Sequence, residues 1–231
     1  MYLTQLPLSL KLRDDAIFDN FFIGENAQLI ATLKKFIFDK SEQFIYCYGE
    51  DGVGRTHLLQ SCCHAANENG RSLFYLSLAT YPELSTDIFE ALEDYDCVCI
   101  DDVDAIVGNE EWEEALFHFY NRVRENNTQL LVSAKIPPQQ LRCILKDLQS
   151  RLIWGLVLEI KKLSDENKIQ ALQLRAQLRG LQLSEDVAHY LIHHYSRNMR
   201  DLVSALEKLD QASLAAKRKL TIPFVKASTV L

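Results

Sequence analysis

The chain has 231 residues and a formal net charge of −7 at pH 7, because 32 Asp and Glu outnumber 25 Lys and Arg. This length allows one large domain, or a large and a small domain, with enough core to fold independently. The acidic balance excludes proteins whose main role is to grip DNA phosphates, since these need a basic face, and we expect no direct sequence-specific DNA binding.

Membrane and disulfide classes are also disfavoured. The sequence has no run of 18 apolar residues, and its N-terminus lacks a basic segment leading into an apolar core. We therefore expect a soluble, cytoplasmic protein with no membrane partner. The six cysteines form no CxxC pair and no regular framework, which predicts buried free thiols.

The first segment, residues 1–12, alternates polar and apolar residues like an extended chain, and Pro7 keeps it out of a helix. One interpretation is an edge strand or an arm packed on its own domain. The other is a docking peptide, in which a glutamine amide binds a polar notch and leucines fill an apolar groove on another protein. The residues concerned are Gln5, Leu6, Leu8 and Leu10.

An aromatic and apolar cluster at residues 19–24 precedes a predicted helix at residues 27–38. Within the cluster, Phe21 and Ile23 could cover an adenine ring if a phosphate site lies nearby. Such clusters are more often plain core, and both interpretations stay open.

The central motif of the sequence is a glycine-rich turn between the β-forming run at residues 44–48 and a predicted helix. Gly49, four residues, Gly54, Arg55 and Thr56 match the Walker A pattern, with Arg in place of the usual Lys. Glycine turns backbone amides inward, and the helix start behind it attracts a phosphate. A planar guanidinium cannot place a point charge between phosphates as an ammonium does, so we expect slow intrinsic hydrolysis. Thr56 would offer its hydroxyl to Mg²⁺.

A Walker B candidate follows a predicted strand at residues 71–78 and a predicted helix at residues 86–95. Residues 96–101 form a buried-type strand that ends in carboxylates. Parallel strands carry functional groups at their carboxyl ends. We therefore predict that Asp101 holds Mg²⁺ through water and that Asp102 orients an attacking water.

The next elements are a predicted amphipathic helix at residues 109–125 and strands at residues 129–133 and 156–160. For Ser133 and Lys135 two interpretations stay open, a γ-phosphate sensor and an ordinary loop. Arg151, before the last strand, is either one half of a surface salt bridge or an arginine finger that reaches a nucleotide on a neighbouring subunit.

From residue 164 the sequence predicts helices alone, beginning near Ser164, Ser184, Asn198 and Thr221. These read as a small helical domain. His189 and His193 have i, i+4 spacing, but no further ligand joins them, so a surface helix is favoured over a metal site.

Taken in this order, the Walker motifs, Arg151 and the turn at residues 198–202 resemble the AAA+ ATPases. Within them the chain resembles the DnaA family, and most closely its Hda group of regulators, essentially from end to end. Residues 5–10 resemble the clamp-binding peptide of that group, and residues 150–155 resemble its arginine-finger box. The resemblance implies nucleotide contacts from Phe21, Ile23, Gly49, Gly52, Val53, Gly54, Arg55, Thr56, His57 and, at the sensor 2 position, Arg200.

The resemblance implies an α/β P-loop fold with a parallel five-stranded sheet flanked by helices, and a small all-helical lid. The expected domains are a clamp-binding arm at residues 1–14, an AAA+ domain at 15–163 and the lid at 164–231. Two features depart from the family pattern. Lys135 and Ile136 replace the usual Asp-Arg pair, and Asp102 stands where close relatives have Asn, which leaves some intrinsic ATPase activity open.

The function implied is negative regulation of replication initiation. Bound to ADP with Mg²⁺, and to the DNA-loaded β sliding clamp of DNA polymerase III, such a protein presents Arg151 to ATP on DnaA and promotes hydrolysis. It is then no enzyme in its own right, and a homodimer is left open. Two alternatives remain: a self-assembling AAA+ ATPase such as a helicase loader, with ATP as its nucleotide, and a pure adaptor whose pocket is structural.

Overall fold

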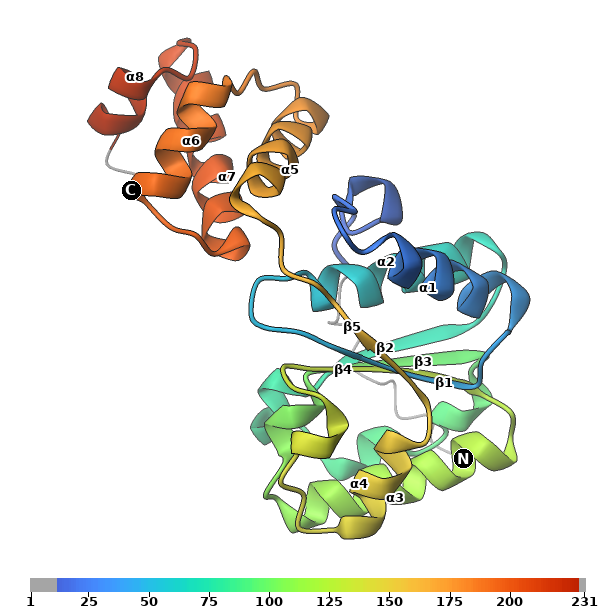
Figure 1. Cartoon of the computed structure of the whole chain (residues 1–231). Helices are drawn as coiled ribbons and strands as arrows, with labels where there is room; N and C mark the ends of the chain where they lie inside the picture. The colour runs from blue at the N-terminus through green and yellow to red at the C-terminus, as the bar shows by residue number, and fades with distance from the viewer. Residues whose placement is uncertain (1–11, 229–231) are drawn as a thin grey trace. The chain divides into compact units, whose positions relative to one another are not determined.

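A computed structural model describes residues 12–228 of the chain, so the predicted clamp-binding residues Gln5, Leu6, Leu8 and Leu10 lie outside the described residues. Its centre is one sheet of five strands in the order β2-β3-β4-β1-β5, and every neighbouring pair is parallel (Figure 1). The strands are β1 (Phe44–Tyr48), β2 (Leu73–Ser77), β3 (Cys97–Asp101), β4 (Gln129–Ala134) and β5 (Leu156–Glu159). The predicted parallel five-stranded sheet is confirmed.

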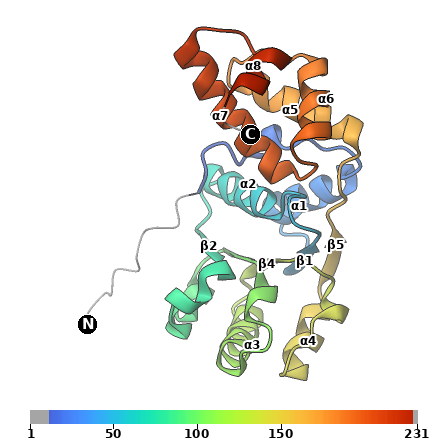
Figure 2. The same cartoon turned by 90° about the vertical axis from the view of Figure 1, so that its left-hand side faces the viewer.

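Helices cover both faces of the sheet, as parallel strands require because each must be reached by a crossover. Four of these helices are α1 (Ala27–Asp39), α2 (Arg55–Glu68), α3 (Glu110–Glu125) and α4 (Lys146–Ile153). Figure 2 shows α1 and α2 on one face, and α3 and α4 on the other. The central strands β3 and β4 are buried along their whole length, which agrees with their mainly apolar sequences.

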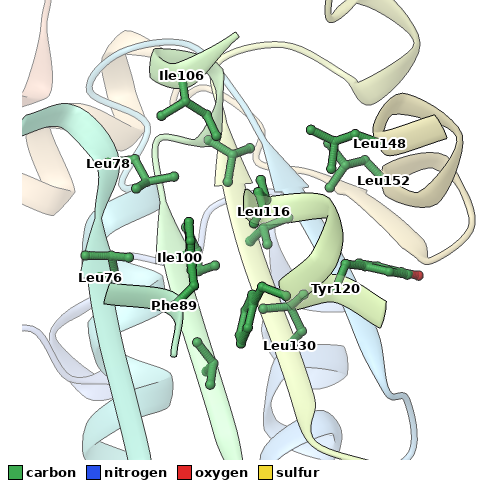
Figure 3. Packing of buried hydrophobic residues seen from close by; sticks show 14 of the residues in the cluster. Leu76, Leu78, Phe89, Ile100, Ile106, Leu116, Tyr120, Leu130, Leu148 and Leu152 are labelled. Atoms are coloured by element: carbon green, nitrogen blue, oxygen red, sulfur yellow. The ribbon is translucent and has the colours of Figure 1, made fainter. Parts of the chain in front are cut away.

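The core between the sheet and α3 and α4 is shown in Figure 3. Leu76, Ile100 and Leu130 project from the strands, and Leu116 and Tyr120 from α3, into one buried cluster. On the opposite face, helices α1 and α2 bury their own apolar side chains against the sheet. These include Leu33, Phe36, Leu58 and Leu59.

The helix predicted at residues 86–95 is wrong. The structure has two short 3-10 helices there, Thr86–Phe89 and Leu92–Asp94, separated by Ala91 in the left-handed conformation at φ +61°. Two carbonyls of this segment accept side-chain hydrogen bonds instead of helical ones: Arg122 Nη2 donates to Phe89 O at 2.8 Å, and Thr128 Oγ1 donates to the carbonyl of residue 93 at 2.6 Å. These tertiary bonds compete with the regular α-helical pattern.

The C-terminal part is entirely helical where it is described, with α5 (Asp165–Leu178), α6 (Glu185–His194), α7 (Met199–Ala216) and α8 (Ile222–Ala227). Three of these helices begin at the predicted caps, because the side chains of Ser164, Asn198 and Thr221 accept hydrogen bonds from backbone N–H groups in the first turn. A separate apolar core holds them together. It includes Leu172, Leu191, Leu206 and Val225.

The described chain divides into two compact units. The first contains residues 12–18, 26–50 and 54–160; the second contains residues 19–25, 51–53 and 161–228. The predicted boundary at residue 164 lies near the start of the long segment of the second unit, but residues 19–25 and 51–53 belong to that unit as well. No helix among residues 12–228 is long and apolar enough to span a membrane.

The strand β5 joins the sheet through a close backbone approach at Gly155. A Cβ atom added there would lie 2.1 Å from Phe44 Cδ1 and 2.8 Å from the Phe44 carbonyl oxygen. The ring of Phe44 cannot yield freely, because it packs edge-on against Tyr120 with 5.2 Å between centroids. Only glycine fits at this position.

Gly155→Ala should therefore lower the free energy of unfolding by about 2 kcal/mol, the usual cost of overpacking, as measured by urea denaturation. Ser150→Ala is the matched control on the exposed side of α4 and should change it by less than about 0.5 kcal/mol. Equal stability of the Gly155 variant and the control would contradict the close approach.

The six cysteines are all buried and free, as predicted. Burial is the main cause that raises the pKa of Cys47 to about 12 and that of Cys143 to about 11. Since only the thiolate reacts, the native protein should leave all six thiols unmodified by DTNB at pH 8, and all six should react after unfolding in guanidinium chloride. Rapid labelling of any thiol in the native protein would contradict this expectation.

Candidate functional site

The glycine-rich turn connects β1 to α2 and has the backbone conformation of an anion-binding loop. Gly52 and Gly54 have φ values of +85° and +101°, which L side chains rarely adopt. Gly54 is the N-cap of α2, and no side chain caps this helix start. A helix start of this kind can bind an anion, because the helix dipole has the favourable direction.

Arg55, the basic residue of the Walker A pattern, is held inside the protein. Its guanidinium donates from Nη1 to the carbonyl of Gly49 and from Nη2 to Oδ1 of Asp102 at 2.9 Å. The side chain of Arg55 is only 7% exposed and that of Asp102 20% exposed, so this ion pair is shielded from solvent. The pairing was not predicted from the sequence, and the water-orienting role of Asp102 stays a prediction.

Asp101 ends β3 as a buried carboxylate surrounded by hydroxyl groups. Oδ2 accepts from Thr56 Oγ1 at 2.6 Å and from the Tyr75 hydroxyl at 3.0 Å, while Oδ1 accepts from Ser133 Oγ. Burial raises the pKa of Asp101, the charge of Asp102 adds to this, and the hydroxyl donors oppose it. The three hydroxyls thus compensate a carboxylate that would be costly to bury alone.

The sequence did not predict Tyr75 in this cluster, and it left the role of Ser133 open. The Ser133 hydroxyl donates to Asp101 and accepts from the backbone N–H of Asp102 at 3.3 Å. The alternation along β2 could have placed Tyr75 on one face of the sheet, but only strand order brings β2 and β4 to the two sides of β3.

Thr56 and Asp101 form a donor set that suits Mg²⁺, since a hydroxyl and a carboxylate oxygen lie 2.6 Å apart at the end of β3. The described residues contain no group of three or more His, Cys, Asp or Glu side chains that could hold a metal ion. Mg²⁺ would thus need phosphate and water oxygens to complete its coordination, as it commonly does in nucleotide sites.

Other predicted nucleotide contacts lie in the second unit: Phe21, Ile23, Gly52, Val53 and Arg200. Within this unit, a Cβ on Gly52 would lie 2.5 Å from Asn198 Oδ1. The same oxygen accepts the backbone N–H of Arg200 at 2.8 Å. Gly52 therefore lies against the start of α7, where Arg200 is, and the nucleotide contact implied for Arg200 stays a prediction.

His57 lies in α2 within the first unit. Its Nε2 is 2.9 Å from the carbonyl oxygen of Ile17, and its side chain is buried. The nucleotide contact implied for His57 stays a prediction.

Arg151 lies in the last turn of α4 and makes no ion pair and no side-chain hydrogen bond with any residue of 12–228. The described residues therefore give no support to the salt-bridge interpretation. Instead the Arg151 guanidinium lies over the ring of Trp154, 5.2 Å from the centroid. The following Gly155 abuts Phe44 at the amino end of β1, whereas Gly49 follows its carboxyl end. A five-residue strand is about 16 Å long. Arg151 therefore lies near the amino ends of the strands, and the glycine-rich turn lies at their carboxyl ends.

Two family models match the chain. The bacterial DnaA ATPase domain matches residues 12–159, well over half of the 231 residues, and the model described as the Hda lid domain matches residues 165–229. The chain belongs to the bacterial DnaA ATPase family.

Solved structures agree with this assignment at the level of the fold. Domain III of the DnaA replication initiation protein of Thermotoga maritima has 22% identity, a TM-score of 0.80 and coverage of 93% of this chain and 95% of that chain. AMPPCP-bound DnaA of Aquifex aeolicus has 23% identity and a TM-score of 0.74, covering 88% and 68%. A RuvB variant of Thermotoga maritima has 16% identity and a TM-score of 0.69, covering 91% and 70%.

Within this DnaA-family fold, the Arg55–Asp102 pair gives a stability prediction. Asp102→Ala leaves a largely buried guanidinium without its carboxylate and should lower the free energy of unfolding by about 2 kcal/mol in urea denaturation. Arg13→Ala, which removes an exposed pair with Asp15, is the control and should cost less than about 1 kcal/mol. Similar losses in the two variants would contradict a shielded pair at Arg55.

Proposed function

We propose that this DnaA-family protein is an Hda-type negative regulator of replication initiation. In this proposal it binds ADP and the DNA-loaded sliding clamp of DNA polymerase III, and it supplies Arg151 in trans to ATP held by DnaA. The stimulated hydrolysis switches the initiator off. The match of residues 165–229 to the Hda lid model supports this choice within the family.

The observation that carries the proposal is the location of Arg151. This guanidinium lies near the amino ends of the strands, whereas the glycine-rich turn of its own chain lies at their carboxyl ends. No carboxylate of the described residues neutralises it. It cannot reach a phosphate in its own turn across about 16 Å of sheet. It is suited to a nucleotide bound by another molecule, which is what an arginine finger in trans requires.

The chain's own nucleotide would be held by groups that need no lysine. The N–H groups at the start of α2 would bind a diphosphate, and the Thr56 hydroxyl and Asp101 carboxylate would hold Mg²⁺. Mg²⁺ would supply charge neutralisation on the phosphates. Because Arg55 is paired with Asp102 and Gly49, it is poorly placed to stabilise charge between β- and γ-phosphates. This supports ADP as the nucleotide and at most weak intrinsic ATPase activity.

The size of the expected effect follows from arginine fingers in general. An arginine that neutralises charge on the transferring phosphoryl group accelerates hydrolysis by about 10³ to 10⁵, or about 4 to 7 kcal/mol of barrier. Binding of both proteins to one clamp would raise their effective concentration and compensate for weak direct contacts. We assign clamp binding to Gln5, Leu6, Leu8 and Leu10, which lie outside the described residues.

The proposal is tested by measuring hydrolysis of DnaA-bound ATP in the presence of the full chain, ADP and DNA-loaded clamp. Arg151→Ala should reduce the stimulated rate by about 10³ or more and leave ADP binding, measured by calorimetry, unchanged. Arg142→Ala removes an equally charged, exposed side chain before α4 and should keep the rate within about 3-fold.

Three outcomes would count against the proposal. Undiminished stimulation by the Arg151 variant would reject the finger assignment. Rapid ATP turnover by the isolated chain would favour a self-assembling ATPase, and calorimetry without ADP or ATP binding would favour a pure adaptor.

A further inference from the structure

Arg151 belongs to a cation–π cluster near the amino ends of the strands. The guanidinium carbons of Arg151 and Arg124 each lie over the Trp154 ring, 5.2 Å from its centroid. Trp154 is 68% exposed, so this large ring is not part of the core. An exposed indole that contacts two cations needs an explanation other than core packing.

The cluster is assembled by the ends of two adjacent helices. Arg124 lies in the last turn of α3, Arg151 lies in the last turn of α4, and Trp154 is the C-cap of α4. Figure 1 shows α3 and α4 side by side on this face of the sheet. Cations are favoured at both places because helix C-termini carry partial negative charge.

The indole is attached to a rigid part of the first unit. The backbone N–H of Trp154 donates to the Arg151 carbonyl at 3.1 Å, and the next residue, Gly155, is in close contact with Phe44. Behind it, the Phe44 ring packs edge-on against Tyr120. The backbone that carries the indole therefore has little freedom.

A long arginine side chain without an ion pair would otherwise sample many rotamers. Within residues 12–228, Arg151 has neither an ion pair nor a side-chain hydrogen bond, so its orientation depends on the indole. A reacting group must be held close to its productive geometry for efficient transition-state stabilisation. Trp is also the aromatic side chain that binds cations best.

We propose that Trp154 is a positioning residue for Arg151, whose ring holds the guanidinium in the orientation from which it serves a nucleotide on the partner. The inference rests on the proposed function of Arg151 and adds the residue that makes the finger effective. Trp154 acts through Arg151 and does not itself touch the phosphates. The interaction should become stronger when the partner displaces water from the cluster.

The test compares Trp154→Ala, Trp154→Phe and Arg124→Gln in the hydrolysis assay with DnaA-bound ATP and DNA-loaded clamp. Trp154→Ala should lower the maximal stimulated rate by about 3- to 30-fold, the range that corresponds to exposed and desolvated cation–π pairs, with little change in the concentration giving half-maximal stimulation. Trp154→Phe should recover part of the rate. Arg124→Gln removes the second cation from the same ring and should stay within about 3-fold.

A second measurement needs no partner. In the NMR spectrum of the isolated chain, the Arg151 Nε–Hε resonance should be shifted upfield by the ring current of Trp154. The shift should disappear in Trp154→Ala and persist in Arg124→Gln.

The outcomes separate this inference from the proposed function. If the unaltered chain does not stimulate hydrolysis, the proposed function fails and the positioning role fails with it. If the unaltered chain stimulates and Trp154→Ala does so at the same maximal rate, the positioning role alone is overturned. In the hydrolysis assay, a change confined to the concentration that gives half-maximal stimulation would make Trp154 a docking contact. In the NMR spectrum, an absent ring-current shift would exclude the stacked geometry. Either result overturns the inference.

Discussion

The hydrogen bonding of the buried Asp101 carboxylate is the constraint on which the carboxyl end of the sheet depends. A carboxylate at the end of a central strand is expensive to bury, and it is compensated by hydroxyls from three different elements: Thr56 of α2, Tyr75 of β2 and Ser133 of β4. Each hydroxyl is correctly placed only if its element has the right register against β3. Satisfying this one group therefore fixes the relative positions of the Walker A helix and three strands.

An ion pair lies beside this carboxylate and affects the chemistry of the glycine-rich turn. Arg55 occupies the place where P-loop proteins use a lysine, yet its guanidinium is directed to Asp102 and the Gly49 carbonyl. The pair neutralises two charges that would be costly if buried separately. It also engages the basic residue and the acidic residue that hydrolysis in cis would need. Binding of a diphosphate and slow turnover are both compatible with such an arrangement.

The guanidinium proposed to act on a partner lies near the amino ends of the strands. Close contact between Gly155 and Phe44 places Trp154 and Arg151 near the amino end of β1. The parallel sheet thus separates the chain's own glycine-rich turn from its unneutralised arginine by the length of a strand. A protein with this layout can hold one nucleotide and expose a guanidinium to another, without the two sites interfering.

Local patterns in the sequence determined much of this protein. The apolar strands, the spacing of Gly49, Gly54 and Thr56, the caps at Ser164 and Asn198, and the family all follow from neighbouring residues, because strand burial, phosphate loops and helix caps have short-range signatures. Only the tertiary structure decided the partners that lie far apart in the chain. Arg55 with Asp102, Tyr75 with Asp101, and Trp154 with Arg124 depend on strand order and helix placement, which sequence spacing does not encode. The helix prediction for residues 86–95 was wrong for the same reason. The side chains of the distant residues Arg122 and Thr128 donate hydrogen bonds to carbonyls of this segment, and these bonds compete with the helical ones.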